Sequence, residues 1–145
     1  MGRVRMDKKL FPNDAIIVTE NFDVHQDWET PIPGFLILAC RRKIRSIMEF
    51  NQEEIQEFGP LLMKVRQALK DVLAIDTVYL YQAEDTTHEQ FHLWILPRYS
   101  WMEKFGTRIQ SVRPIIEHAK ERFGDERNIV AVKETARTLR ESIEK

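Results

Sequence analysis

Short apolar runs and longer helical repeats alternate along this chain, and together they predict its elements. Runs rich in β-branched and aromatic residues predict strands, and they lie at residues 16–24, 35–40, 77–82 and 89–99. A polar break at Glu20-Asn21 leaves the first run as either one strand with a turn or two short strands. The run from Phe35 to Cys40 is apolar throughout, which predicts a buried strand.

The longest helical repeat begins after Asn51. Apolar residues recur there at helical spacing, at Ile55, Phe58, Leu62, Val65, Leu69 and Val72. Asn51 can cap this helix, and Glu54 at the third helical position would complete a capping box. Gly59-Pro60 interrupts the repeat. Because proline suits a first helical turn, we expect either a kink or a new helix start near Pro60.

Two further helices are expected in the C-terminal third. One runs from Val112 to Phe123, with Pro114 near its start and Gly124-Asp125 after its end, and the other is amphipathic from Glu134 to Glu144. Taken with the strands, these segments predict an α+β domain. It would have an antiparallel β-sheet with its helices on one face.

Composition and charge exclude several classes of function. The chain has 145 residues, of which 43% are hydrophobic and 31% charged, as is typical of one soluble globular domain. A formal net charge of −1 gives no general attraction toward nucleic acid or an anionic membrane. No apolar run approaches the roughly 18 residues that span a bilayer. The basic start, residues 1–9, lacks an apolar signal core, so we expect a cytoplasmic protein.

The end of the second apolar run carries two candidate features. Cys40 is the single cysteine, so no internal disulfide can form, no Cys-based zinc site is indicated, and a small buried hydrophobe is expected. Basic residues follow it closely, at Arg41, Arg42, Lys43 and Arg45. They form either a solvated strand end or a partner for substrate phosphates.

The last apolar run carries the side chain of greatest chemical interest, His92. An imidazole at neutral pH can act as a nucleophile or carry a proton. A lone histidine on a half-buried strand is more often structural, so the residues around His92 decide its interpretation.

The segment His92-Leu93-Trp94-Ile95-Leu96-Pro97-Arg98 resembles the signature strand of the histidine-triad (HIT) superfamily. Members of that superfamily bind nucleotides and break or transfer phosphoanhydride, phosphoester or phosphoramidate bonds. Their pattern has three histidines at alternate positions, then two apolar residues, then often Pro-Arg. Anchored on Pro97-Arg98, the triad positions fall on Gln90, His92 and Trp94, so the resemblance implies that the nucleophile, His92, is kept and both flanking histidines are replaced. A register over His88, Gln90 and His92 places Pro97 two residues too far along, and we disfavour it.

A second match lies upstream, in the segment from Asp27 through Pro31-Ile32-Pro33-Gly34 to the apolar run. The resemblance implies that Asp27 binds the ribose, and Phe35 stands where many members have another histidine. The resemblance covers about residues 16–101 of a single HIT-like domain, 1–145. It implies an antiparallel β-sheet with one main helix packed on it plus C-terminal helices, with an extension at about 106–145.

Two triad replacements change the chemistry that can be expected. Gln90 can donate from its amide to a phosphate oxygen and so partly replace a histidine. Trp94 has an indole N–H that donates one hydrogen bond but cannot carry a proton at neutral pH. Loss of a general acid, typically worth about 10²–10⁴-fold, predicts a slower enzyme unless the leaving group needs no proton.

Other candidate site residues have equally ordinary alternatives. The resemblance implies phosphate contacts from Thr86 and Thr87, which otherwise are turn residues. His88 is a candidate acid or an exposed loop histidine, and Trp28 packs against a base or serves as a core aromatic.

His25 and His118 are expected to be structural. The histidines are not arranged for a metal ion, because His88 and His92 are four residues apart on a loop and a strand rather than on a helix. No metal and no cofactor are therefore expected.

Three hypotheses follow. The first is a nucleotidyl hydrolase or transferase that acts on a diadenosine polyphosphate-like substrate through a nucleotidyl-histidine intermediate. The second is a catalytically weak or inactive nucleotide-binding protein, and the third a fold with a vestigial pocket. The expected partner is a nucleotide. Because HIT proteins are often symmetric dimers, the resemblance also implies a homodimer, with the helix at 51–73 as a contact.

Overall fold

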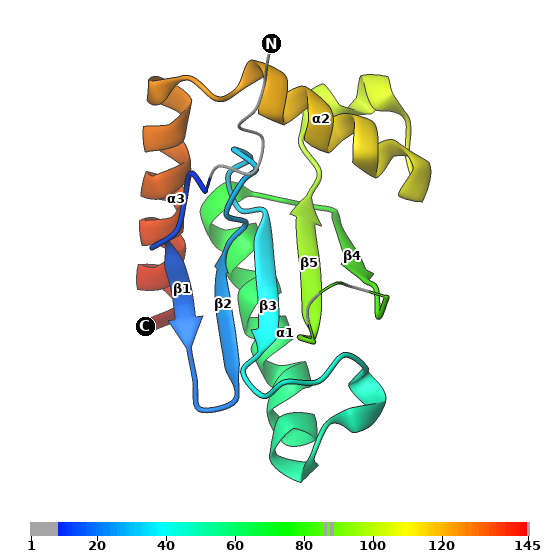
Figure 1. Cartoon of the computed structure of the whole chain (residues 1–145). Helices are drawn as coiled ribbons and strands as arrows, with labels where there is room; N and C mark the ends of the chain where they lie inside the picture. Colours follow the sequence, from blue (N-terminus) through cyan, green and yellow to red (C-terminus); the bar gives the residue numbers. More distant parts are fainter. Residues whose placement is uncertain (1–8, 86, 88, 145) are drawn as a thin grey trace.

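Five strands form one antiparallel sheet in the computed structural model, which describes residues 9–85, 87 and 89–144 (Figure 1). They are β1 (Ala15–Val18), β2 (Phe22–Gln26), β3 (Leu36–Cys40), β4 (Val78–Gln82) and β5 (His92–Pro97). Their order across the sheet is β1-β2-β3-β5-β4, so the last strand in sequence lies between β3 and β4. The first apolar run therefore forms two short strands, one of the two alternatives that its polar break left open.

The register of the sheet decides which side chains share a face. Ala39 on β3 pairs with His92, and Ile37 pairs with Trp94. Since successive side chains alternate between faces, His92 and Trp94 lie on one face, and Leu93 and Ile95 lie on the other. The second group packs into the main hydrophobic core.

The helix α1 (Gln52–Leu73) covers the face that carries Ile95. Its start was predicted correctly, because the Asn51 side chain accepts from the Glu54 amide and the Glu54 side chain accepts from the Asn51 amide. The helix continues unbroken through Pro60, so of the two expected alternatives, a kink or a new helix start, the new start is excluded. Pro60 and Gln56, whose carbonyl loses its helical donor, are both exposed, so water can replace the missing hydrogen bond.

A buried carboxylate ties the start of α1 to the end of β3. Glu54 is 1% exposed and accepts hydrogen bonds from Arg42 Nε at 3.0 Å and Nη2 at 2.9 Å. The Cys40 thiol also donates to it, at 3.4 Å. The Arg42 guanidinium holds the pKa of Glu54 at about 2, and burial raises the pKa of Cys40 to about 11. Arg42 thus has a structural partner, and Cys40 is a buried, un-ionised thiol.

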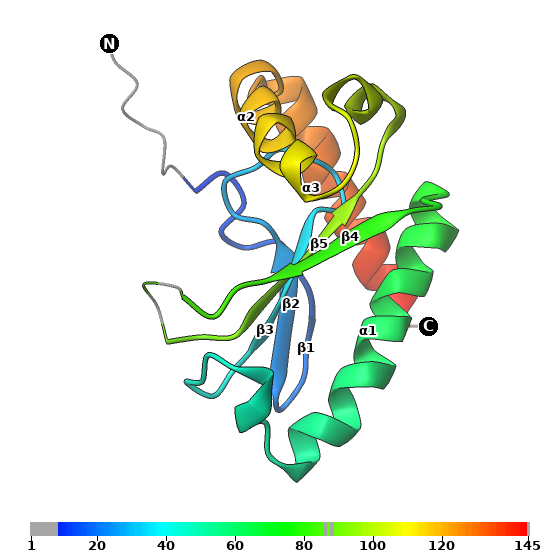
Figure 2. The ribbon, with the colours of Figure 1, turned by 90° about the vertical axis from the view of Figure 1, so that its right-hand side faces the viewer.

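The C-terminal helices occupy different places. The helix α3 (Glu126–Glu144) packs beside α1 and β1, whereas α2 (Val112–Arg122) packs on the opposite face of the sheet, over one end (Figures 1 and 2). The prediction that all helices lie on one face is therefore wrong. Short 3₁₀ segments complete the fold: η1 (Ile47–Glu49), η2 (Ser100–Phe105) and η3 (Ile109–Ser111).

The helix α3 begins eight residues before the expected Glu134. Its first two turns expose most of their side chains, so they show little apolar periodicity, and Val132 is the first buried residue. The Asp125 carboxylate accepts from the Asn128 amide at 3.3 Å and so supports the earlier start. None of the helices described is long and apolar enough to cross a bilayer.

A second apolar cluster joins α2 to the sheet. Phe35 and Leu96 from the sheet side pack with Met102 of η2 and with Ile115 and Ala119 of α2. This cluster holds α2 above the face that carries His92 and leaves the middle of that face uncovered by helix.

Candidate active site

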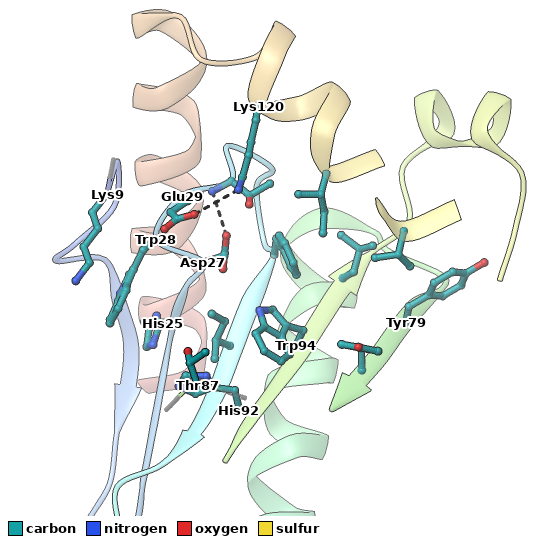
Figure 3. A pocket seen from close by; sticks show the side chains of 17 residues that line it. Lys9, His25, Asp27, Trp28, Glu29, Tyr79, Thr87, His92, Trp94 and Lys120 are labelled. Carbon is teal, nitrogen blue, oxygen red and sulfur yellow. Dashed lines mark hydrogen bonds and ion pairs between the residues drawn. The ribbon is translucent and has the colours of Figure 1, made fainter. Parts of the chain in front are cut away.

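A cavity of about 760 Å³ opens on the face of the sheet opposite α1 (Figure 3). It is lined by β2 and the loop after it, by β3, β4 and β5, and by one side of α2. Strand alternation brings His25, Ile37, Tyr79, Tyr81, His92, Trp94 and Leu96 into the lining. The cavity is therefore built on the strand that was singled out from the sequence.

His92 and Trp94 stand side by side in this cavity. Their rings meet edge to face, with centroids 5.6 Å apart at 80°. Trp94 also packs against Tyr81, its pairing partner on β4, at 5.8 Å. These contacts place an indole beside the predicted nucleophile, at the position that the resemblance assigns to the third triad residue.

Gln90 is not part of the cavity lining. Its side-chain amide donates to the Cys40 carbonyl at 3.0 Å and so fastens the entry of β5 to the end of β3. An amide NH₂ has a second donor. The role of Gln90 toward a phosphate stays a prediction.

Asp27 lines the cavity from the loop after β2. The Thr30 amide donates to its Oδ2 at 3.0 Å, and the Asp27 amide donates to the Phe35 carbonyl at 2.8 Å. Burial raises the pKa of Asp27, while hydrogen bonds from Thr30 and Glu29 and the charge of Lys120 act in the opposite direction. The carboxylate is thus held at one end of the cavity with hydrogen-bonding capacity left for a ligand.

Trp28 stacks on His25, with ring centroids 5.1 Å apart and planes at 16°. The Lys9 ammonium lies 4.1 Å from the Trp28 ring centroid, and Figure 3 shows Lys9 and His25 on either side of that ring. His25 and Lys9 thus both contact the Trp28 ring, and contact between Trp28 and a base stays a prediction.

His25, expected to be structural, lines the cavity. Its Nδ1 lies 3.0 Å from the Gln26 carbonyl oxygen, a contact that orients the ring. This position could be recognised only from the pairing of strands. His25 pairs with Ile37 on β3, and Ile37 pairs in turn with Trp94 on β5. His118 packs outside the cavity, against Trp101 and Phe105.

The helix α2 contributes a charged residue that sequence reasoning missed. Lys120 forms an ion pair with Glu29 at 3.3 Å, above Asp27 (Figure 3). Val112 and Ile116 of the same helix also line the cavity. No local pattern points to these residues, because they reach the site only through the packing of the second apolar cluster.

The loop between β4 and β5 is described in part. Thr87 lines the cavity beside His92 (Figure 3), whereas Thr86 and His88 lie outside the described residues. Within residues 9–85, 87 and 89–144, no group of three or more His, Cys, Asp or Glu side chains is arranged for a metal ion.

The sequence matches no protein-family model and no curated protein. Solved structures do match. A zinc-bound histidine triad family protein from Mycobacterium smegmatis has a TM-score of 0.63 at 16% identity, with 92% of this chain and 85% of that one covered. A hypothetical histidine triad nucleotide-binding protein from Sulfolobus tokodaii has a TM-score of 0.62 at 16% identity, with coverages of 90% and 83%.

A third similar structure is the diadenosine triphosphate hydrolase of Plasmodium falciparum in complex with cyclomarin A. It has a TM-score of 0.61 at 14% identity and covers 99% of this chain and 87% of that one. The chain therefore has a HIT-like fold, an antiparallel five-stranded sheet with helices, as the sequence predicted.

Proposed function

We propose that this protein is a nucleotide hydrolase or transferase that acts on a phosphoanhydride or related bond through a nucleotidyl-histidine intermediate. The observation that carries the proposal is the position of His92 on the floor of a cavity in a HIT-like fold. The cavity is large enough for a nucleotide, since ligand pockets are typically about 300–1,000 Å³.

The reaction needs two displacements at one phosphorus. A ring nitrogen of His92 attacks the α-phosphorus, the bond from phosphorus to the leaving group breaks, and the leaving group departs with the electron pair. Water then attacks the same phosphorus and loses a proton to solvent, the phosphorus–nitrogen bond breaks, and the electron pair returns to the imidazole. A nucleophile other than water would make the protein a transferase.

Asp27 is the residue that we propose for holding the ribose. An ionised carboxylate can accept hydrogen bonds from both hydroxyls of a 2′,3′-diol. Oδ2 already accepts from the Thr30 amide, which fixes the orientation of the carboxylate toward the cavity. Thr87, and the predicted contacts Thr86 and His88, would face the phosphates from the loop before β5.

A second candidate function is nucleotide binding without efficient turnover. Two observations favour it: an indole takes the third triad position, and the Gln90 amide is engaged by the Cys40 carbonyl. On this alternative the cavity binds a nucleotide, but it has no proton carrier at the third triad position, and one of the two Gln90 amide hydrogens is already engaged.

Turnover measured on wild type and His92→Ala in parallel separates these two. The substrates are diadenosine polyphosphates and an AMP-amine conjugate, with AMP binding followed by calorimetry. Turnover that requires His92 would support the hydrolase or transferase. Binding without turnover would reject it in favour of the binding protein, and absence of both would limit the likeness to the fold.

The chain also carries a surface that fits the proposed homodimer. Ile55 and Met63 are exposed on α1, and Leu80 is exposed on β4, the edge strand on that side of the sheet. The Arg66 guanidinium donates to the carbonyl of Ile75, in the segment between α1 and β4. The side of α1 that carries Arg66 therefore faces the segment that leads to β4. Molar mass from light scattering, with Met63→Lys as the disrupting variant, tests the assembly.

We further propose that residues 1–145 act as one domain and function in the cytoplasm. The extension at about 106–145 supplies Val112, Ile116 and Lys120 to the same cavity as the HIT-like core. A single buried free thiol suits a reducing compartment.

A further inference from the structure

The cavity extends past Asp27, on the side away from His92. Figure 3 shows Glu29 and Lys120 there, beyond the Asp27 carboxylate as seen from His92. Glu29 comes from the loop after β2. Lys120 comes from α2, in the extension outside the segment whose sequence resembles HIT proteins. Part of this end of the cavity therefore lies outside what the resemblance covers.

The proposed function places the phosphorus at His92 and the ribose diol at Asp27. The base of the nucleotide then occupies the lining beyond or beside Asp27, where Trp28, Glu29 and Lys120 lie. An aromatic ring such as that of Trp28 can contact only the flat face of a base, and every base has such a face. Discrimination between bases therefore depends on the polar groups that meet the edge of the base.

Glu29 and Lys120 are polar groups that can meet this edge. The Lys120 ammonium donates to Glu29 Oε1 at 3.3 Å, and the two side chains are 39% and 36% exposed, with Lys120 first. In the described part of the chain, neither side chain makes another hydrogen bond or ion pair. An ammonium has three donors, and a carboxylate has two acceptor oxygens. The pair therefore keeps both donors and acceptors for a ligand.

Guanine is the base whose edge fits this pair best. Its O6 accepts a hydrogen bond, and the neighbouring N1–H and N2–H groups donate. Lys120 can donate to O6 while the Glu29 carboxylate accepts from both N–H groups, and all these bonds are charge-assisted. Adenine offers the same pair one amino group and one ring nitrogen, so the carboxylate accepts one hydrogen bond from adenine but two from guanine.

The ion pair can open to admit a base edge at small cost. A partly exposed pair contributes little to stability, because water screens its charges. In the opened pair, O6 replaces the carboxylate as acceptor for Lys120, and the two N–H groups replace the ammonium as donors to Glu29. Neither charge is then left without a partner, which would be costly.

Resting on the proposed function, we infer that Glu29 and Lys120 recognise the edge of the base and that the nucleotide preferred by this cavity is a guanine nucleotide. The two side chains contact the base and take no part at the phosphorus. They determine specificity, whereas His92 carries out the chemistry.

Binding of GMP, IMP and AMP to the full-length protein, measured by calorimetry, tests this inference. GMP and IMP differ only in the 2-amino group, and IMP and AMP differ only at position 6 and the proton on N1. We expect GMP to bind tighter than AMP by about tenfold or more, since unpaired polar groups penalise the ligand that lacks the matching hydrogen bonds. The affinity of IMP should lie between the two.

Glu29→Gln should remove most of the preference for GMP, because an amide oxygen carries no charge and its NH₂ group repels the N–H donors of guanine. AMP affinity should change little. Glu117→Gln is the matched control. It breaks a similar ion pair on α2, with Arg113 at 3.3 Å, and Glu117 does not line the cavity.

The outcomes separate the inference from the proposed function. A preference for GMP that is lost in Glu29→Gln and kept in Glu117→Gln supports the inference. Equal affinities for the three nucleotides, tighter binding of AMP, or a preference that both variants keep or both lose overturns it. Turnover that requires His92 leaves the proposed function standing in each of these cases. If none of the three nucleotides binds, the inference fails, and the same turnover decides the proposed function.

Discussion

The cavity has a charged end, at Asp27, Glu29 and Lys120, and an aromatic end, at Trp94, Tyr81 and Tyr79, and different parts of the chain build them (Figure 3). The charged end is formed by the loop after β2 and by α2. Glu29 of the loop forms an ion pair with Lys120 of α2, above Asp27. The aromatic end comes from the alternation of two paired strands, with Trp94 against Tyr81. The comparison teaches that a HIT-like sheet fixes the place of His92, whereas its neighbours on either side decide what can bind.

Removal of His92 should have the largest effect on turnover, because His92 is the proposed nucleophile that forms the bond to phosphorus. We expect His92→Ala to lower turnover by about 10³-fold or more, as losses of catalytic nucleophiles do. Product release measured by chromatography checks this. An unchanged melting temperature and retained AMP binding would show that chemistry, not folding, was lost; turnover within a few-fold of wild type would exclude His92 as the nucleophile.

Asp27→Asn should affect the charged end alone. Hydrogen bonds to a charged group are worth about 1.5–3 kcal/mol, so AMP affinity should fall by about 10–100-fold. Calorimetry with AMP and with its 2′,3′-dideoxy analogue is the measurement. The variant should bind both nucleotides about equally, and an undiminished preference for the diol would remove Asp27 from the ribose site.

The same carboxylate predicts a pH dependence. The proposed ribose contact requires the ionised form of Asp27, and burial raises its pKa above the ordinary value of 3.8. AMP affinity should therefore be full above the raised pKa and be lost as pH falls through it, at a higher pH than for an exposed aspartate. The Asp27→Asn variant should show no such loss of AMP affinity. The same pH dependence of affinity in both proteins would contradict the assignment of Asp27 to the ribose.

Trp94→His should sharpen the contrast at the aromatic end. An imidazole there can donate the proton that an amine leaving group needs, whereas a nucleotide phosphate leaves without one. The rate for an AMP-amine conjugate relative to diadenosine triphosphate should therefore rise by about tenfold, less than a fully evolved acid provides. Trp94→Phe is the matched control, since it keeps an aromatic wall without a proton carrier. An equal ratio in both variants would mean that proton supply does not limit the wild type.

Lys120→Ala should have the smallest effect. The Lys120–Glu29 pair is partly exposed, and such pairs contribute about 0–1 kcal/mol. We expect AMP affinity to change by less than about fivefold and the melting temperature to shift little. A larger loss would show that Lys120 contacts the ligand directly.

Features set by local sequence could be predicted, whereas features set by the packing of distant segments could not. The Asn51–Glu54 capping box depends on local chemistry, and the sequence predicted it. The polar break at Glu20-Asn21 is also local, but it left one strand or two as open alternatives, and the structure has two. The placement of His92 on a strand followed from a motif. In contrast, the cavity positions of His25 and Lys120 depend on which strands pair and on where α2 docks, and neither is encoded within a short window.

Helix boundaries failed for a related reason. Pro60 interrupts the apolar pattern in the sequence but does not end the helix; Pro60 and Gln56 are both exposed, so water can replace the hydrogen bond that the proline removes. The first turns of α3 are helical although their side chains are mostly exposed, so a search for apolar periodicity passes over them.

The most direct measurement is capture of the covalent intermediate. The protein is mixed with diadenosine triphosphate or an AMP-amine conjugate and quenched within the first turnover at alkaline pH, where a nucleotidyl-histidine is preserved. Its peptides are then analysed by mass spectrometry. We predict a nucleotidyl adduct on the peptide that contains His92, absent in His92→Ala. Turnover without an adduct on that peptide, or with one on another residue, would contradict the assignment of His92 as the nucleophile.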